Sequence, residues 1–310
     1  MSIIVNNITK KYGVQNAVDN ISFEVKQGEI LGFLGPNGAG KTTTMKMITC
    51  FLAPTSGDIT IGDFSVLNDH LKIKQKLGYL PENNPLYPDM PVLEYLQYVA
   101  ELQEVPREKI KERIAKMVHV CGLNSEKHKK IGELSKGFRQ RVGLAQAMIH
   151  DPEILILDEP TTGLDPNQIV EIRKLIRDLG KEKTVILSTH ILPEVEATCD
   201  RILIINNGKI VADGTPESLR KKSQGQEVIK IQIKEADNID DVITSLQKID
   251  SVSIVDPVSM EDFTFMITSK EGESSCKNIF TLCVKKNWFL TQLIPVETSL
   301  EDIFRNLTIN

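Results

Sequence analysis

Residues 35–42 read Gly-Pro-Asn-Gly-Ala-Gly-Lys-Thr, which matches the phosphate-loop pattern G-x-x-x-x-G-K-S/T at every fixed position. The three glycines allow a tight turn, so that successive backbone N–H groups can surround a phosphate at the positive end of the following helix. Residues 29–34 form a short apolar run typical of a buried parallel strand, and 43–52 continue with helical spacing. The segment therefore predicts a binding site for a nucleoside triphosphate rather than a chance glycine turn.

Two side chains of this loop have chemical parts in that site. Lys41 supplies a point charge for the outer phosphates, and Thr42 offers a hydroxyl to Mg²⁺, a hard cation that prefers oxygen ligands. The predicted nucleotide-binding residues of this segment are Gly35, Pro36, Asn37, Gly38, Ala39, Gly40, Lys41, Thr42 and Thr43.

The composition is that of an ordinary globular protein and excludes several classes. At 310 residues the chain is long enough for two domains, taking ~150 residues per domain. The net charge is -5 and the isoelectric point about 5.7, with basic residues spread along the chain. Because nucleic-acid binders concentrate positive charge, we expect no DNA or RNA partner.

Neither membrane spans nor disulfides are expected. The longest purely apolar stretches, such as 154–157 and 202–205, are far shorter than the ~20 residues that a membrane helix needs. Residues 1–13 do not resemble a secretory signal, so we expect a cytoplasmic protein. The five cysteines are odd in number, widely spaced and never in C-x-x-C form, which indicates reduced packing residues.

Strand and helix patterns alternate over the first two thirds of the chain, which predicts an α/β fold with a parallel sheet. A helix is expected from Pro166, with Asp165 as N-cap and Gly180 just past its end. Helical spacing also marks 91–121 as a helical insertion. The predicted strands are 2–8, 21–25, 29–34, 57–61, 154–157, 184–188 and 201–206.

The polar stretch 214–226 indicates a domain boundary, with a first domain over 1–220 and an α+β accessory domain over 226–310. Within the second domain, the order β-α-β-β-α-β matches the split motif of ferredoxin-like folds. A last short helix over 299–307 would be capped by Ser299. The predicted elements of the second domain are strands 227–233, 251–255, 262–267 and 288–294 and helices 238–248 and 275–286.

A second chemical motif is the apolar strand 154–159, Ile-Leu-Ile-Leu-Asp-Glu, which ends in two adjacent carboxylates. Asp158 would help to hold Mg²⁺, directly or through a water, and Glu159 would orient the water that attacks the terminal phosphate. An acidic pair at a strand end is more often a solvated pair. The buried run before it favours the functional interpretation.

Residues 134–140 read Leu-Ser-Lys-Gly-Phe-Arg-Gln and lead into an amphipathic helix that reaches residue 149, with Ser135 as N-cap. Taken alone, this is a capped helix. Between the phosphate loop and the paired carboxylates, however, it resembles the Leu-Ser-Gly-Gly-Gln signature of ABC transporter ATP-binding subunits. The resemblance spans roughly 3–214 and implies a P-loop NTPase domain with a β-rich N-terminal subdomain and a helical insertion over about 83–150.

The resemblance implies ATP as the nucleotide and gives roles to further residues. Tyr12 falls where the family has its adenine-stacking aromatic; the alternative is an ordinary tyrosine at a strand edge. His190 matches the histidine that contacts the terminal phosphate and organises the attacking water. Gly163, Leu164 and Asp165 match a loop that communicates across a dimer. The other histidines receive no role.

Two departures from the family pattern concern chemistry. Glu82 stands where the family has a glutamine that senses Mg²⁺ and water; a carboxylate can still ligate Mg²⁺ but adds negative charge. Lys136 and Phe138 replace a glycine and a glutamine of the signature, while Ser135 and Gly137 remain, so phosphate binding should survive. The predicted catalytic residues are Lys41, Glu82, Glu159 and His190, and the predicted metal ligands are Thr42, Glu82 and Asp158.

In this family two ATP-binding domains close head to tail, each ATP lying between one phosphate loop and the other subunit's signature. The resemblance therefore implies a homodimer, or a heterodimer with a related subunit, at the inner face of the cell membrane. Separate membrane permease subunits would receive the work, with a contact over 83–98, where Pro85, Leu86, Tyr87 and Pro88 could form an exposed apolar patch. These residues could instead cover the core.

Two rivals come from other classes. A soluble ATPase of the same superfamily acting on nucleic acid or ribosomes usually has two such units or a long coiled-coil insertion, and neither is present in the sequence. A kinase that shares only the phosphate loop would lack the signature and His190. Within the family, residues 78–87, the signature and the C-terminal extension resemble the ABC-2 type subgroup. More narrowly they resemble the gliding-motility-associated ATP-binding subunit of Bacteroidetes, and the same residues are equally compatible with a polymer, lipid or drug exporter.

Overall fold

The computed structural model describes residues 1–223, 227–236, 238–270, 272–296 and 300–308. Contacts within the chain divide it into two compact units, Met1–Pro216 with Leu307–Asn310, and Glu217–Asn306. Each unit has a hydrophobic core of its own.

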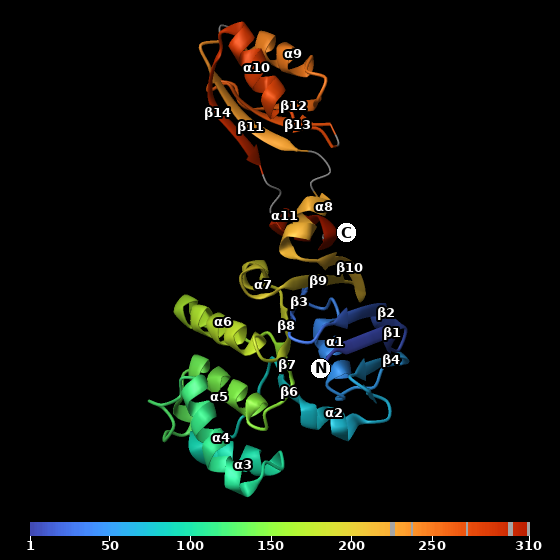
Figure 1. The fold of residues 1–310 in the computed structure, drawn as a ribbon, viewed down its shortest axis with the longest axis vertical. Helices are drawn as coiled ribbons and strands as arrows, with labels where there is room; N and C mark the ends of the chain where they lie inside the picture. The colour runs from blue at the N-terminus through green and yellow to red at the C-terminus, as the bar shows by residue number, and fades with distance from the viewer. Residues whose placement is uncertain (224–226, 237, 271, 297–299, 309–310) are drawn as a thin grey trace. The chain divides into compact units, whose positions relative to one another are not determined.

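The first unit contains a predominantly parallel sheet (Figure 1). The residues of its central strands are buried throughout. Burial on both faces explains why these strands appear in the sequence as continuous apolar runs. Neighbouring strands are parallel except for the edge pair β9 and β10. The strand order is β10-β9-β3-β8-β7-β6, with β3 Ile30–Leu34, β6 Leu77–Leu80, β7 Ile154–Asp158, β8 Thr184–Thr189, β9 Arg201–Asn206 and β10 Lys209–Gly214.

A second, antiparallel sheet of this unit has the order β2-β1-β4-β5. Its members are β1 Ile3–Tyr12, β2 Gln15–Val25, β4 Ser56–Ile61 and β5 Phe64–Ser65. The predicted α/β class with a β-rich beginning is therefore confirmed. Strands β1 and β2 extend beyond their predicted ends at Ile8 and Ile21 to a hairpin that pairs Tyr12 with Gln15. Residues 11–15 at this end are all exposed, Val14 included, so no alternation of buried apolar residues marks it in the sequence.

Helices connect the strands of the first unit. The phosphate loop leads into α1 (Lys41–Ile48), α2 (His70–Lys76) precedes β6, and α7 (Leu192–Thr198) precedes β9. Asp165 caps α6 (Pro166–Gly180) by accepting a 3.0 Å hydrogen bond from the Gln168 N–H. Gly180 was expected just past this helix, but it is the last helical residue. A side chain at Gly180 would meet the Ile30 side chain of β3, which would then have to shift.

The helices coloured green in Figure 1 form a group beside β6 and β7. They are α3 (Val92–Leu102), α4 (Arg107–Val120) and α5 (Lys136–Met148). The predicted helical stretch 91–121 is thus two helices, because α4 begins afresh after Pro106. The Tyr95 hydroxyl donates a 2.6 Å hydrogen bond to Gln146 Oε1. Arg113 donates to the carbonyls of Met148 and Ile149, which ties α4 to the end of α5.

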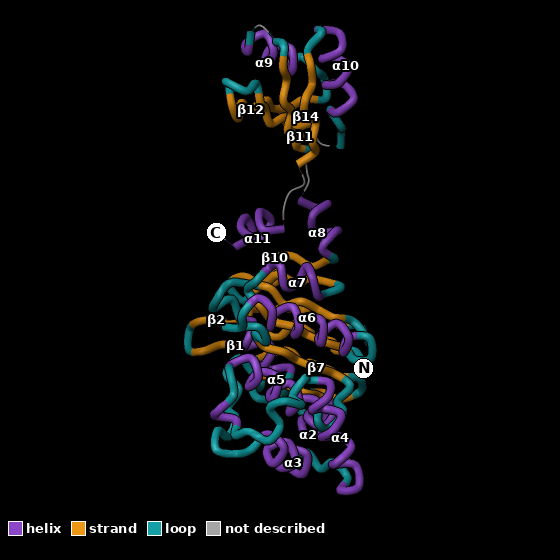
Figure 2. Tube along the Cα trace, turned by 90° about the vertical axis from the view of Figure 1, so that its left-hand side faces the viewer, coloured by secondary structure: helices purple, strands orange, loops and turns teal. Residues whose placement is uncertain are grey.

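The second unit has the predicted β-α-β-β-α-β order. Figure 2 shows its helices α9 and α10 together with strands β11, β12 and β14. Its antiparallel sheet has the strand order β12-β13-β11-β14. Part of the polar stretch 214–226 forms α8 (Pro216–Ser223), whereas 224–226 lie outside the described residues. The elements that follow are β11 Val228–Lys234, α9 Ile239–Gln247, β12 Val252–Ser259, β13 Thr264–Ser269, α10 Cys276–Lys286, β14 Phe289–Val296 and α11 Leu300–Thr308. The proposed cap Ser299 lies outside the described residues.

Candidate nucleotide site

The phosphate loop occupies the turn between the carboxyl end of β3 and the first turn of α1. Gly40, the residue before α1, has φ 109, a backbone conformation that residues with a side chain rarely adopt. A side chain at Gly35 or Gly40 would also collide with a backbone carbonyl of a neighbouring strand. No side chain caps α1, so its first N–H groups remain open to a ligand. The glycines therefore serve both the turn and the close packing around it.

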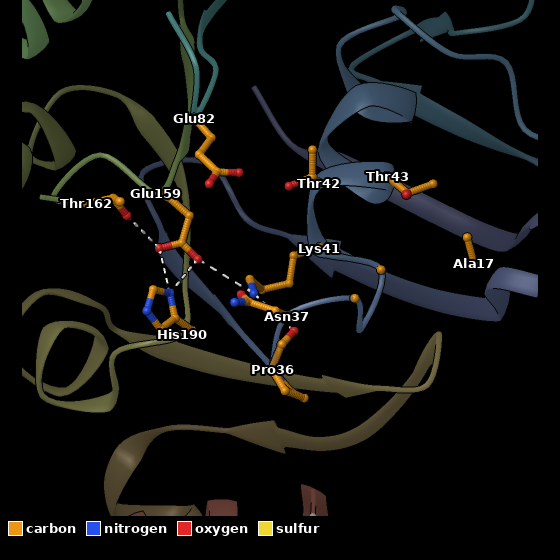
Figure 3. A pocket seen from close by; sticks show the side chains of 12 residues that line it. Ala17, Pro36, Asn37, Lys41, Thr42, Thr43, Glu82, Glu159, Thr162 and His190 are labelled. Atoms are coloured by element: carbon orange, nitrogen blue, oxygen red, sulfur yellow. Dashed lines mark hydrogen bonds and ion pairs between the residues drawn. The ribbon is translucent and has the colours of Figure 1, made fainter.

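A cavity of about 420 Å³ lies in front of this loop (Figure 3). It collects side chains from β2, the phosphate loop, the segment after β6, the end of β7 and the end of β8. The carboxyl ends of parallel strands converge here, as is general for ligand sites of open α/β sheets. The lining residues are Ala17, Pro36, Asn37, Gly38, Gly40, Lys41, Thr42, Thr43, Glu82, Glu159, Thr162 and His190.

Glu159 stands directly after β7 with φ 50, and its side chain is only 6% exposed. Both carboxylate oxygens lie 3.0 Å from His190 Nδ1, and Oε2 also accepts a 3.3 Å hydrogen bond from the Thr162 hydroxyl. Such a backbone conformation is costly for a non-glycine residue and is concentrated at functional sites. Figure 3 shows the Glu159 carboxylate held between His190 and Thr162.

Lys41 approaches the same carboxylate from the loop. Its Nζ lies 3.6 Å from Glu159 Oε1 and donates hydrogen bonds to the carbonyls of Gly35 at 2.7 Å and Pro36 at 3.3 Å. With both charged groups almost completely buried, the pair is anchored by several partners on each side, as buried charges must be. The cation and the carboxylate are therefore fixed next to each other in the wall of the cavity.

Asp158, the last residue of β7, is fully buried. Its Oδ1 accepts a hydrogen bond from the Ser188 hydroxyl, while Oδ2 has no hydrogen-bond partner among the described residues. Burial raises the pKa of Asp158; the nearby Ser188 and Thr42 hydroxyls oppose this shift, the Glu159 charge adds to it, and the Lys41 charge opposes it. An orphaned carboxylate oxygen near a threonine hydroxyl is a donor set that fits Mg²⁺.

Glu82 follows β6 and is exposed. Figure 3 shows its side chain directed toward the phosphate loop. The same residue lines a second cavity, of about 390 Å³, together with Lys136 and Arg139 at the start of α5. Glu82 and Lys136, the two charged residues that depart from the family pattern, therefore line the same cavity.

The signature residues lie elsewhere. Ser135 caps α5 by accepting a 3.3 Å hydrogen bond from the Phe138 N–H, and neither Ser135 nor Gly137 lines the cavity in front of the phosphate loop. Gly137 is buried against Gln168 of α6, close to the helix that Asp165 caps. Within one chain, the phosphate loop and the signature thus do not meet.

Tyr12 is 54% exposed at the end of β1, with Lys10 Nζ 5.7 Å from its ring centroid. It does not line the cavity, whereas Ala17 of β2 does. The hairpin between these two residues therefore borders the site through a residue that the sequence did not single out.

Comparison with known proteins fits this geometry. A sequence model of the family described as ABC transporter matches residues 18–162. The bacitracin transport ATP-binding protein of Bacillus licheniformis is 35% identical over 311 residues, covering 99% of this chain and 98% of that protein. The linearmycin resistance ATP-binding protein of Bacillus subtilis is 34% identical over 307 residues, with 97% and 96% covered. The chain belongs to the ATP-binding subunits of ABC transporters.

Solved structures of this ABC family agree on the fold. A dimeric ATP-binding cassette in a post-hydrolysis state, bound to ADP and Pi, is 26% identical with a TM-score of 0.64; the match covers 69% of this chain and 98% of that one. The chain is accordingly an ABC ATPase. Among the described residues, no helix combines the length and apolar character needed to cross a membrane.

The sequence alone did not identify several residues around the nucleotide site. Ala17 and Thr162 belong to no recognisable motif, since alanine and threonine are common in any strand or loop. Ser188 and Glu194 make hydrogen bonds in the buried region behind the cavity. For Glu194 the sequence held a weak signal, because this carboxylate comes four residues after His190 on a short helix whose buried residues pack against the core. Its partners could not be read from the sequence.

Proposed function

We propose that this chain is the ATP-hydrolysing subunit of an ABC-2 type exporter, placed at the inner face of the membrane and acting on separate permease subunits. Residues 1–220 form the ATP-binding domain in this proposal and 226–310 an accessory domain. The names of the relatives, one for bacitracin transport and one for linearmycin resistance, support export. The observation that carries the ATPase site is the Glu159 carboxylate held between His190 and Lys41 at the phosphate loop.

The proposed roles follow the cavity. The backbone of Gly35, Pro36, Asn37, Gly38, Ala39 and Gly40, with Lys41 and Thr43, would hold the phosphates of ATP. Thr42, Asp158 and Glu82 would hold Mg²⁺, which when bound supplies charge stabilisation to the phosphoryl group. Glu159 would orient the attacking water and accept its proton, and His190 would keep that carboxylate in place and face the terminal phosphate.

A second protomer would complete the site. Ser135 and Gly137 stand outside the cavity of their own chain, so their phosphate-binding helix end is available to a partner's nucleotide. Asp165 would help to transmit closure across the dimer, and Tyr12 would stack on the adenine. A related ATP-binding subunit could replace the second copy. No nucleic acid is needed in this scheme.

The permease contact is proposed at 83–98 and the groove beside it. A cavity of about 440 Å³ is bordered by Asn83, Asn84 and Pro85 and by the exposed Phe51. The Tyr79 hydroxyl, the Asn84 carboxamide and His150 Nδ1 line it as buried polar atoms without hydrogen-bond partners among the described residues. Because unpaired buried polar groups are costly, a partner segment with both apolar and hydrogen-bonding groups fits this groove.

The exposed aromatic Tyr87 extends this surface. Its ring centroid lies 5.8 Å from that of Tyr98 and 5.9 Å from that of Tyr95. The nearby Leu86 is half-buried, so it serves the core and the surface together. We place the permease contact on this combined patch rather than assigning these residues to core packing alone.

The narrower proposal of a gliding-motility exporter rests on residues 78–87 and the signature. Identifying the membrane protein that binds this chain tests that proposal. Affinity purification of the chain from solubilised membranes, with ATP and the slow variant Glu159→Gln, should recover a polytopic membrane protein. The double variant Tyr87→Ala/Phe51→Ala should lose that partner while keeping ATP binding. Recovery of RNA or DNA in place of a membrane protein would favour the soluble ATPase alternative.

A further inference from the structure

Glu194 is a buried carboxylate that has no part in the proposed chemistry. It belongs to α7, is 1% exposed and does not line the nucleotide cavity. A carboxylate in such a place is costly unless hydrogen bonds hold it. Its environment therefore calls for an explanation.

Two hydroxyl groups donate to the same oxygen of Glu194. The Thr161 hydroxyl lies 2.7 Å from Oε2 and the Thr189 hydroxyl 3.0 Å. The other oxygen, Oε1, has no hydrogen-bond partner among the described residues. The carboxylate thus connects two loops at one point and leaves half of its hydrogen-bonding capacity unused.

Each of these threonines lies beside a proposed catalytic residue. Thr161 is two residues after Glu159, and its neighbour Thr162 donates to the Glu159 carboxylate. Thr189 directly precedes His190, and its hydroxyl also accepts a 3.1 Å hydrogen bond from the Ile191 N–H. The two loops that Glu194 connects are those that bring Glu159 and His190 within 3.0 Å of each other.

We infer that Glu194 is a positioning residue that fixes the spacing between the Glu159 loop and the His190 loop; this inference rests on the proposed site. Glu159 emerges in a strained backbone conformation, with φ 50, so its direction depends on surrounding contacts. A misplacement of about 1 Å at a catalytic group can cost roughly a hundredfold in rate. The Glu194 bridge acts on turnover without touching ATP.

The test uses the full chain and steady-state ATPase kinetics. Glu194→Ala removes both bridges and should lower kcat roughly 10- to 100-fold while ATP affinity stays within about twofold. Glu194→Gln retains an oxygen that can accept from both threonines and should recover most of the rate. Thr198→Val is the matched control, because it changes a buried residue of the same helix whose hydroxyl has no partner among the described residues.

A double-mutant cycle separates positioning from general stability. If the bridge acts as one unit, Thr161→Val combined with Glu194→Ala should be no slower than Glu194→Ala alone. Should Glu194→Ala fail to fold, Thr161→Val and Thr189→Val each remove one bridge and should each lower kcat. Unchanged kcat in the folded variants, with only a lower Tm, overturns the inference.

The proposed site has its own control in the same assay. Glu159→Gln must abolish most turnover; if it does not, the assignment of Glu159 fails independently of Glu194. Loss of turnover in Glu159→Gln together with normal turnover in Glu194→Ala overturns the positioning role alone.

Discussion

The phosphate loop and the signature helix differ in how much of their environment one chain supplies. Around the loop, Lys41 and Glu159 are buried and held by carbonyls, His190 and Thr162. At the start of α5, the Ser135 hydroxyl receives one hydrogen bond, from its own helix, and Ser135 itself is exposed. The side chains around the loop are thus fixed by contacts within one chain, whereas Ser135 at the start of α5 is open to solvent, where the proposed function places a partner's nucleotide.

This difference predicts two classes of variant. Changes at the loop should alter events within one protomer, such as ATP binding and the chemical step. Changes at the signature should leave binding to one protomer intact and alter pairing. The composite site is therefore testable by asking where each defect arises.

The largest effect is expected for Glu159→Gln. The amide keeps the shape and the contact with His190 but cannot accept a proton, so turnover should fall roughly 10²- to 10⁴-fold. ATP binding, measured by titration with a fluorescent analogue, should persist, and size-exclusion chromatography with ATP should show an accumulated dimer. Glu153→Gln, an exposed carboxylate before the same strand, is the control. Normal turnover in Glu159→Gln would remove this residue from the role of base.

Lys41→Ala should impair ATP binding, the step that precedes hydrolysis. Loss of a charge-assisted contact to phosphate should weaken ATP binding by roughly tenfold to a hundredfold. It also leaves Glu159 buried without its nearby cation, so the free energy of unfolding should fall. Lys46→Ala, in the last turn of the same helix, controls for helix effects. Native affinity in Lys41→Ala would contradict the assignment of the loop.

Ser135→Ala tests the other region. The lost cap should cost about 1 kcal/mol of stability. ATP should still bind to the isolated protomer, while ATP-dependent pairing weakens and turnover falls about tenfold. The deciding experiment mixes Ser135→Ala with Lys41→Ala. A head-to-tail mixed dimer contains one site with intact Lys41 and intact Ser135, so activity should exceed that of either variant alone. No recovery on mixing would break the composite-site scheme.

The same contrast explains which parts the sequence predicts. Strands β3, β7 and β8 are buried throughout, so their apolar runs and the residues at their ends could be located in the sequence. The hairpin end at Tyr12 and the partly exposed β10 lack such a pattern. The bridge from Thr161 through Glu194 to Thr189 depends on β7 and β8 being neighbours, which spacing along the chain does not encode. Local motifs were thus predictable, whereas cross-strand polar contacts were not.

The smallest effect is expected at Glu82 and Lys136, the two charged residues that differ from the family pattern. Glu82 and Lys136 line the same cavity of about 390 Å³, which includes residues at the start of α5. Glu82 also faces the phosphate loop, and the Lys136 side chain packs against Gly163 in the loop after Glu159. Opposite charges across a partly solvated cavity attract, so Lys136 should offset part of the cost of the Glu82 charge near bound phosphates.

Glu82→Gln and Lys136→Gly should therefore be non-additive. Each single variant leaves one uncompensated charge and should change the ATPase rate and its Mg²⁺ dependence several-fold, whereas the double variant should return toward the parent, with a coupling of about 1 kcal/mol. Glu133→Gln, an exposed carboxylate near the same helix start, is the control for surface charge. Strictly additive rates would mean that the two departures act separately. Non-additive rates would mean that the loop and the signature region communicate within a single chain as well as across the dimer.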